Sequence, residues 1–297
     1  MNILTGFLMA VLAGLFLAGF GVAISIGVRK RLDMFQFLFW NAFMTAILAM
    51  IYPGRLDIAF AQGVPRFGEL VWWIVGGGVC SISGSLFVQR AMKHGSNNLV
   101  WAIQQAGLLL PFLSGILFFR QSCGVFQIFG VGLIVAGLFL PSGECGAKNG
   151  FLRWFPFALG AFLFMGLAEA MQSVPSYWNT WQDTAVLRPS LAYAGGSLGS
   201  AMAALFLKRK LLPVKHVTML FAAGVAVWNV FTVICMFKAL DICSVNGIGS
   251  FGFPVMIGAS ILFFAAYSVF VIREKNTARQ WGGLAAILAG VVIISLR

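Results

Sequence analysis

Residues 89–111 read QRAMKHGSNNLVWAIQQAGLLLP, a stretch with five amide side chains and one tryptophan between apolar segments. Side chains three, four and seven positions apart lie on one face of a helix. Asn98, Trp101 and Gln105 therefore share a face. Lipid would leave such amides without hydrogen bonds, at a cost of several kcal/mol for each group. The stretch predicts a helix whose polar face meets other helices or water.

The rest of the chain has the composition of a membrane protein. Of its 297 residues, 60% are hydrophobic and 9% are charged, whereas a soluble domain carries roughly 25% charged residues. A bilayer span needs about 20 apolar residues, and such runs predict an all-α polytopic membrane protein because a barrel would need alternating strands. The ten candidate spans are 3–28, 34–52, 69–89, 97–119, 124–141, 152–173, 188–207, 217–237, 246–272 and 279–296.

The basic residues predict the orientation of these spans. The net charge is +12, and 14 of the 20 Lys and Arg residues lie in the five loops that follow the odd-numbered spans. The other loops and the chain ends carry the remaining 6. The positive-inside rule places the rich loops in the cytoplasm and both termini outside. Membrane topology explains this charge without nucleic acid. We expect a multi-pass protein of the plasma membrane (the bacterial inner membrane), with membrane lipid and a small-molecule substrate as partners.

The residues that usually carry metal or catalytic chemistry are scattered. The cysteines stand at positions 80, 123, 145, 235 and 243, and the histidines at 94 and 216. They form no metal-ligand spacing, and no HExxH or Walker pattern is present. We therefore expect no metal, no cofactor and no enzymatic activity.

The chain also contains an internal repeat. A shift of 148 residues places QRAMKHGSNNLV (89–100) over FKALDICSVNGI (237–248), and a shift of 153 places RQSCGVFQIFGVGLIVAG (120–137) over REKNTARQWGGLAAILAG (273–290). Polar residues and glycines match at equivalent helix positions. The identical pairs include Ala91/Ala239, Ser96/Ser244, Asn98/Asn246, Gly130/Gly283, Ile134/Ile287 and Gly137/Gly290.

Each copy of the repeat holds five spans, which is an odd number, so the second copy must enter the membrane upside down. We predict a first five-helix repeat at 1–143, a polar linker at 144–151 and a second, inverted repeat at 152–297. Inverted repeats are typical of alternating-access transporters, whose substrate site lies near the midplane between the halves.

Ten spans arranged as five plus five, the Ala-Met/Leu pair that ends the third and eighth spans, and the amide-bearing start of the fourth resemble the drug/metabolite transporter superfamily. The RKR run directly after the first span is similar to the rhamnose/glucose-uptake branch. Many members, EamA-type exporters among them, have both termini in the cytoplasm. The charge distribution disagrees with that orientation and favours the uptake branch over those exporters.

The resemblance implies that the fourth helix lines a central cavity, although its amides could equally serve as contacts between helices. Two further indole–amide neighbours lie in spans 34–52 and 217–237. Aromatic rings cover the C–H faces of a sugar while amides bind its hydroxyl groups. The candidate substrate-binding residues are Trp40, Asn41, Gln89, Asn98, Trp101, Gln105, Trp228, Asn229 and Asn246.

Three other residues stand out inside the spans. Pro111 and Pro254 each remove a helix hydrogen bond, and they predict either gates or static kinks. Glu169 is an acid within span 152–173, where an uncompensated carboxylate costs roughly 2–3 kcal/mol. It is either a proton-coupling group or a structural residue near the outer end of its helix.

Together these features favour a secondary transporter of a small polar metabolite that works by alternating access. A sugar or sugar-like solute, coupled to protons through Glu169, fits the amides and rings best. An exporter of hydrophobic or cationic compounds, or of amino-acid-like metabolites, is the alternative on the same fold. A non-transporting scaffold is a further alternative, with polar residues that only hold helices together. Small residues along 279–296 leave a homodimer open.

Overall fold

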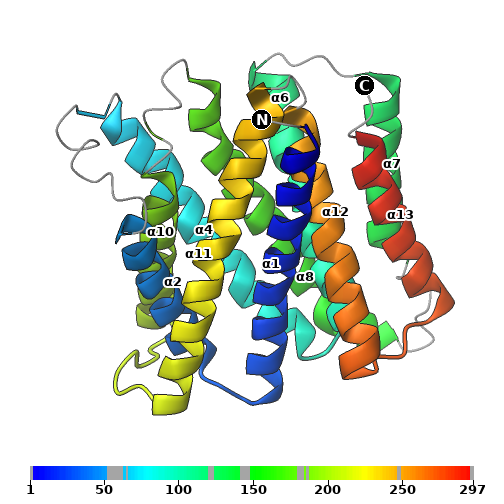
Figure 1. Ribbon diagram of the computed structural model, residues 1–297. Helices are drawn as coiled ribbons and strands as arrows, with labels where there is room; N and C mark the ends of the chain where they lie inside the picture. Colours follow the sequence, from blue (N-terminus) through cyan, green and yellow to red (C-terminus); the bar gives the residue numbers. More distant parts are fainter. Residues whose placement is uncertain are drawn as a thin grey trace.

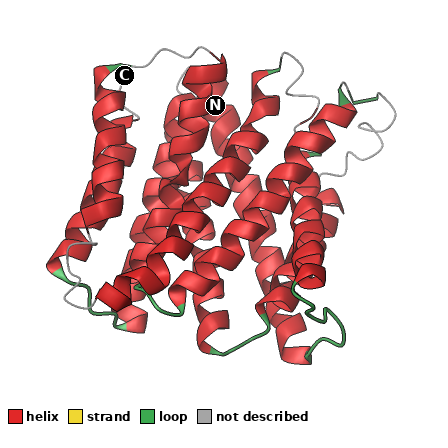
Figure 2. Ribbon diagram, turned by 180° about the vertical axis from the view of Figure 1, so that it is seen from behind, coloured by secondary structure: helices red, strands yellow, loops and turns green. Residues whose placement is uncertain are grey.

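The computed structural model describes residues 3–51, 63–64, 66–119, 124–140, 148–178, 184, 187–245 and 249–294. These residues form a bundle of helices joined by short loops, with no strand among them (Figures 1 and 2). The helices in chain order are α1 (Ile3–Arg29), α2 (Met34–Ile51), α4 (Phe67–Met92), α5 (Asn97–Gln105), η1 (Ala106–Leu108), α6 (Leu109–Phe119), α7 (Val125–Phe139), α8 (Lys148–Ser173), η3 (Val174–Tyr177), α10 (Arg188–Phe206), α11 (His216–Val245), α12 (Gly249–Tyr267), η4 (Ser268–Ile272) and α13 (Ala278–Ile294).

Each apolar run of the sequence has become a helix, because only a helix satisfies the backbone within its own segment. Within the described part, seven helical segments are long and apolar enough to cross a bilayer, while α7 and α13 are apolar but shorter. The boundaries follow the expected spans closely. The main differences are α8, which begins at Lys148 rather than at 152, and α11, which continues to Val245 rather than ending at 237.

The helix over 97–119 changes its geometry in the middle. Ala106–Leu108 form a 3-10 turn between α5 and α6, and Pro111 follows in the first turn of α6. Proline cannot donate the hydrogen bond that would reach back four residues to Gly107. At Gly107 the helix also passes very close to α8, since a Cβ there would lie 2.8 Å from the carbonyl oxygen of Phe162. Pro254 lies inside α12, and the α-helix continues past it to Tyr267.

The helices pack between the two halves of the chain as much as within them. Helix α1 packs against α11 and α12, α4 packs against α8 and α10, and α2 lies between α10 and α11. Helices α7 and α13 pack against each other at one side of the bundle (Figure 1). Small residues permit these close approaches. A Cβ at Gly78 of α4, for example, would lie 2.0 Å from the carbonyl oxygen of Ala192 in α10.

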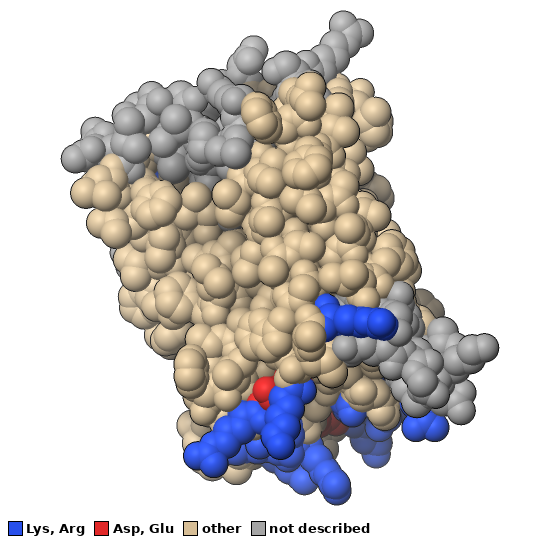
Figure 3. Space-filling model, turned by 90° about the vertical axis from the view of Figure 1, so that its right-hand side faces the viewer, with Lys and Arg blue, Asp and Glu red and all other residues tan. Residues whose placement is uncertain are grey.

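The loops after α1, α4, α10 and η4 meet at one end of the bundle, which we call the basic end. The beginning of α1 and the end of α13 lie at the opposite end (Figure 1). On the face drawn in Figure 3, Lys and Arg side chains gather toward the basic end. Two helices end there in turns of the same type. In each turn a cation adopts the left-handed conformation at the position usually taken by glycine. These cations are Arg31 after α1 (φ 52°) and Lys208 after α10 (φ 51°).

Candidate functional site

The polar face predicted from residues 89–111 lies inside the bundle, and Trp101 is its centre. Trp101 is fully buried, and its ring stacks on Phe264 of α12 with 5.2 Å between centroids. Its Nε1 donates a hydrogen bond to the hydroxyl of Ser260 at 3.2 Å, and Gln105 Nε2 donates to the same oxygen at 3.0 Å. The structure thus joins two predicted site residues through a serine of α12 that sequence reasoning missed. The only sequence signal was a serine inside an apolar span.

The two indole–amide neighbours also come together. Asn229 Nδ2 of α11 donates to Asn41 Oδ1 of α2 at 3.2 Å, and both side chains are buried. Trp228 donates from Nε1 to the carbonyl oxygen of Phe16 in α1 at 2.7 Å. Trp40 is different, because its Nε1 is buried and has no hydrogen-bond partner in the described part of the chain.

Two further buried polar atoms lie between Trp101 and the basic end. Helix α5 runs away from the basic end and α1 runs toward it, and a Cβ at Gly21 of α1 would lie 2.8 Å from the Trp101 ring. About one turn closer to the basic end stand Asn98 on α5 and Ser25 on α1. Asn98 Oδ1 and Ser25 Oγ are buried and have no hydrogen-bond partner among the described residues. Unpaired buried oxygens at one level mark a place that could accept a ligand's hydroxyl groups.

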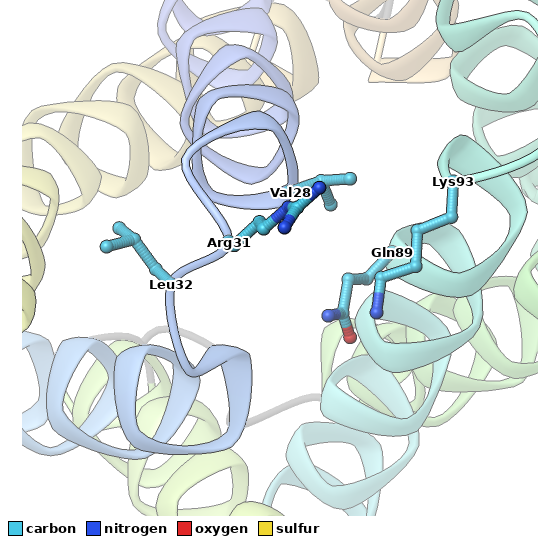
Figure 4. Close-up of a pocket in the computed structure, with 5 residues that line it drawn as sticks. All are labelled: Val28, Arg31, Leu32, Gln89 and Lys93. Atoms are coloured by element: carbon cyan, nitrogen blue, oxygen red, sulfur yellow. The ribbon is translucent and has the colours of Figure 1, made fainter.

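A cavity opens at the basic end between α1 and α4. It has a volume of about 420 Å³ and is lined by Val28, Arg31, Leu32, Gln89 and Lys93. Figure 4 shows Arg31 on the α1 side of the opening and Gln89 with Lys93 on the α4 side. The volume lies within the roughly 300–1,000 Å³ of small-molecule sites. Of the predicted site residues, Gln89 lines this cavity, whereas Arg31 and Lys93 were not among the residues that the sequence assigned to a site.

Glu274, in the loop after η4, caps the N-terminus of α5. Its carboxylate accepts hydrogen bonds from the backbone N–H groups of Asn97 at 2.8 Å and Asn98 at 3.4 Å, and from the hydroxyl of Ser268. A carboxylate at a helix N-terminus satisfies free N–H groups and the helix dipole. The sequence does not predict this role of Glu274, because nothing local links it to a helix that starts 177 positions earlier.

The remaining predicted residues lie apart from this centre. Glu169 stands about one turn before the end of α8 at Ser173, at the end of the bundle opposite the basic one, and its Oε2 is buried without a hydrogen-bond partner in the described part of the chain. Gln172, three residues further along α8, packs against α4. A Cβ at Gly77 of α4 would lie 2.7 Å from its Cγ. Asn246 lies outside the described residues. The structure therefore separates Glu169 from the Trp101 centre.

Comparison with known proteins finds one matching sequence family and 17 matching chains among the solved structures. Residues 4–143 match the sequence model of the EamA-like transporter family. No curated protein matches the chain. A solved structure, titled only "Crystal structure of protein", aligns over 97% of this chain and 96% of that chain with a TM-score of 0.58 and 13% identity. At 13% identity, this likeness concerns the fold alone.

Proposed function

We infer that this chain, whose residues 4–143 form an EamA-like domain of the drug/metabolite transporter superfamily, moves a small polar metabolite across the membrane by alternating access. The family consists of integral membrane transporters rather than enzymes, so transport of a small solute is the activity of the chain. The proposal has three further parts: the architecture of the two halves, the kind of solute, and the coupling of transport to protons. Our expectation of a chain nearer the rhamnose/glucose-uptake branch stays a prediction.

The proposed architecture is ten helices in two inverted five-helix repeats, and contacts between α7 and α13 support it. A Cβ at Gly137 would lie 2.7 Å from the carbonyl oxygen of Gly283, and a Cβ at Gly290 would lie 2.6 Å from the carbonyl oxygen of Gly130. The 153-residue shift pairs Gly137 with Gly290 and Gly130 with Gly283. The contact of Gly137 with Gly283 is thus matched by the equivalent contact of Gly290 with Gly130, as in a two-fold symmetric interface.

A second pair of contacts supports the same symmetry. A Cβ at Gly14 of α1 would lie 2.7 Å from the Cβ of Ala259 in α12, and a Cβ at Gly166 of α8 would lie 2.5 Å from the carbonyl oxygen of Gly107. A shift of 152 residues relates Gly14 to Gly166 and Gly107 to Ala259. Helix α1 therefore meets α12 in the way that α8 meets the α5–α6 segment. We propose repeats at 1–143 and 152–297.

The proposed solute is a sugar or sugar-like molecule, and one observation carries this choice. The polar side chains meet across the two halves of the chain rather than within one half. Trp101 and Gln105 reach Ser260, and Asn229 reaches Asn41. A solute site between inverted repeats needs polar groups at this boundary. Rings beside amides, with the unpaired oxygens of Asn98 and Ser25 nearby, suit a hydroxylated molecule.

The alternative, export of hydrophobic or cationic compounds, fits the cavity less well. Two of the five residues that line the cavity are cations and none is an acid. A cationic solute would be repelled at this opening, and a hydrophobic one would strip water from Arg31, Gln89 and Lys93. Orientation completes the proposal. With the basic end in the cytoplasm, the cavity faces inward and both termini lie outside.

Proton coupling through Glu169 belongs to the same proposal. The buried, unpartnered Oε2 of Glu169 supports it, because a carboxyl without a cation nearby is costly to keep ionised. Glu169 lies on α8, whose neighbour α4 also carries Gln89 of the cavity. Movement between α4 and α8 is a direct route by which proton binding could alter access to the solute. Pro111 and Pro254 keep their proposed role as gates.

Uptake by reconstituted vesicles tests the proposed function. We expect accumulation of a labelled sugar or sugar derivative from a panel, and we expect Asn98→Ala to weaken it at least tenfold, about 1.4 kcal/mol of binding, with normal expression and folding. Trp101→Phe is the companion variant, since it keeps an aromatic ring and removes the N–H. A panel in which only hydrophobic cations move would replace this proposal with the exporter alternative.

A further inference from the structure

The geometry points to a specific property of the solute: the cavity between α1 and α4 binds an anionic group, a carboxylate or phosphate, carried by the transported molecule. This inference rests on the proposed function and names its substrate class more closely, as a sugar acid or sugar phosphate. It begins from the three polar residues that line the cavity, Arg31, Gln89 and Lys93.

The two cations of the cavity have no acid partner in the described part of the chain. At the basic end, Asp33 already accepts the backbone N–H groups of Phe35 at 3.0 Å and Gln36 at 3.3 Å, where it starts α2. Glu274 is likewise held by α5 and Ser268. The ion pair of the described residues, between Arg66 and Glu69, involves neither cavity cation. An anion entering the cavity would therefore meet uncompensated positive charge.

The side chains of these residues face one opening from two helices. Arg31 lies on the α1 side, across from Gln89 and Lys93 on α4 (Figure 4). A guanidinium offers a planar fork that binds carboxylate or phosphate through two hydrogen bonds, and an ammonium adds a compact charge. The amide of Gln89 can donate to or accept from a hydroxyl group. This set matches a molecule with one anionic group on a hydroxylated body.

The turn that ends α1 fixes the position of Arg31. Its N–H bonds to the carbonyl oxygen of Val28 at 3.2 Å, and the N–H of Leu32 bonds to that of Gly27 at 3.0 Å. With Arg31 at φ 52°, this is the Schellman turn that usually holds glycine. Lys208 closes α10 in the same way, so the turn itself is no evidence of a ligand. Its effect is to hold Arg31 beside the cavity.

One face of α1 runs from the cavity toward Trp101 and carries Ser25 between them. Gly21, Ser25 and Val28 follow one face of α1 at intervals of three or four residues. Val28 and Leu32 line the cavity, Ser25 has a buried hydroxyl without a partner, and Gly21 contacts Trp101. An anionic group held at the cavity mouth would direct the hydroxylated body of the same molecule toward Ser25 and Asn98.

Neighbouring cations provide matched controls. Arg29 and Lys30 belong to the same basic run as Arg31 but do not line the cavity. Arg90, next to Gln89, is turned to the ring of Phe157, with its Cζ 5.5 Å from the ring centroid. Lys30→Gln removes the same charge from the same loop as Arg31→Gln. Any effect through membrane topology or net charge should appear in both variants.

Thermal unfolding of the purified full-length protein in detergent tests the inference, with glucose, glucuronate, glucose 6-phosphate and inorganic phosphate as probes. We expect glucuronate or glucose 6-phosphate to raise the melting temperature more than glucose does. Arg31→Gln and Lys93→Gln should each weaken that apparent affinity at least tenfold, while Lys30→Gln leaves it unchanged. Equal loss in Lys30→Gln, or no stabilisation by any anionic probe, overturns the inference.

Lipid and transport arms separate the remaining explanations. If phosphatidylglycerol vesicles give an Arg31-dependent shift and no solute does, the cavity binds a lipid headgroup and the substrate inference is wrong. If vesicles take up glucose equally well with wild type and Arg31→Gln, the proposed function stands and the anionic inference fails. If anionic sugars bind through Arg31 but no sugar is transported, the proposed function fails while the anion site remains.

Discussion

The indole of Trp101 and the hydroxyl of Ser260 are joined by a hydrogen bond of 3.2 Å although 159 residues separate them in the chain. The same hydroxyl accepts from Gln105 at 3.0 Å. One small side chain of α12 therefore serves two buried donors of α5. The bond connects the first half of the chain to the second where the sequence places most of its amides.

This relationship predicts a large effect for Ser260→Ala. The variant leaves the N–H groups of Trp101 and Gln105 buried without an acceptor, at about 1–3 kcal/mol for each group. We expect a clear fall in the melting temperature of the purified protein. Ser197→Ala is the control, because among the described residues that hydroxyl donates to the carbonyl oxygen of Tyr193 in its own helix. Equal melting temperatures for the two variants would contradict the shared-acceptor role.

The contact of α7 with α13 predicts that two substitutions behave alike. Gly137→Ala and Gly290→Ala each push a methyl group against a facing backbone carbonyl, and overpacking of this kind costs typically about 1–3 kcal/mol. The effects should be similar in size because the proposed repeat relates the two sites. Gly132→Ala, on the same helix α7 with open space around it, should change little. Thermal unfolding measures all three, and strongly unequal losses at Gly137 and Gly290 count against the two-fold arrangement.

The distribution of cations predicts the orientation in the membrane. With 14 of the 20 Lys and Arg residues in the loops that follow the odd-numbered spans, we expect the basic end in the cytoplasm and the C-terminus outside. Reporters active only in the cytoplasm or only outside it, fused to the C-terminus, measure this. A C-terminus that reports from the cytoplasm would reverse the orientation and make the cavity of Arg31 and Lys93 face outward.

The position of Glu169 predicts a separation of binding from coupling. Glu169→Gln keeps the shape of the neutral carboxyl, so we expect substrate binding and exchange between loaded sides to continue. Accumulation driven by an imposed pH gradient should be lost, because a group couples to transport only if its two forms favour different conformations. Vesicles with and without the gradient give the measurement. Undiminished accumulation would leave Glu169 a structural residue.

Much of the fold could be predicted from the sequence because lipid imposes a strong local rule. Every segment had to satisfy its own backbone, so the apolar runs marked the helices to within a few residues at most ends. The glycine match Gly137/Gly290 could also be found, since at both positions a Cβ would meet a facing backbone carbonyl. The early start of α8 at Lys148 was missed because PSGECGAKNG reads as a polar linker.

The site was less accessible because its bonds cross long distances in the chain. Asn41, Trp101, Gln105 and Asn229 were identified as polar residues in apolar spans, but their partners could not be predicted. Ser260 is a lone serine whose importance comes only from the two donors that face it. Arg31 and Lys93 both lie in basic loops and line a cavity. The sequence shows the basic loops, but it does not show the cavity.

The reciprocal glycine contacts between α7 and α13 have a mechanical consequence. When a transporter of two inverted repeats changes its access, each half takes the conformation that the other half had. An interface between two equivalent helices has the same contacts before and after this exchange. If the proposed inverted repeats are correct, the interface between α7 and α13 can therefore keep one geometry throughout the transport cycle. The differences between the inward and outward forms would then reside in other contacts of the bundle.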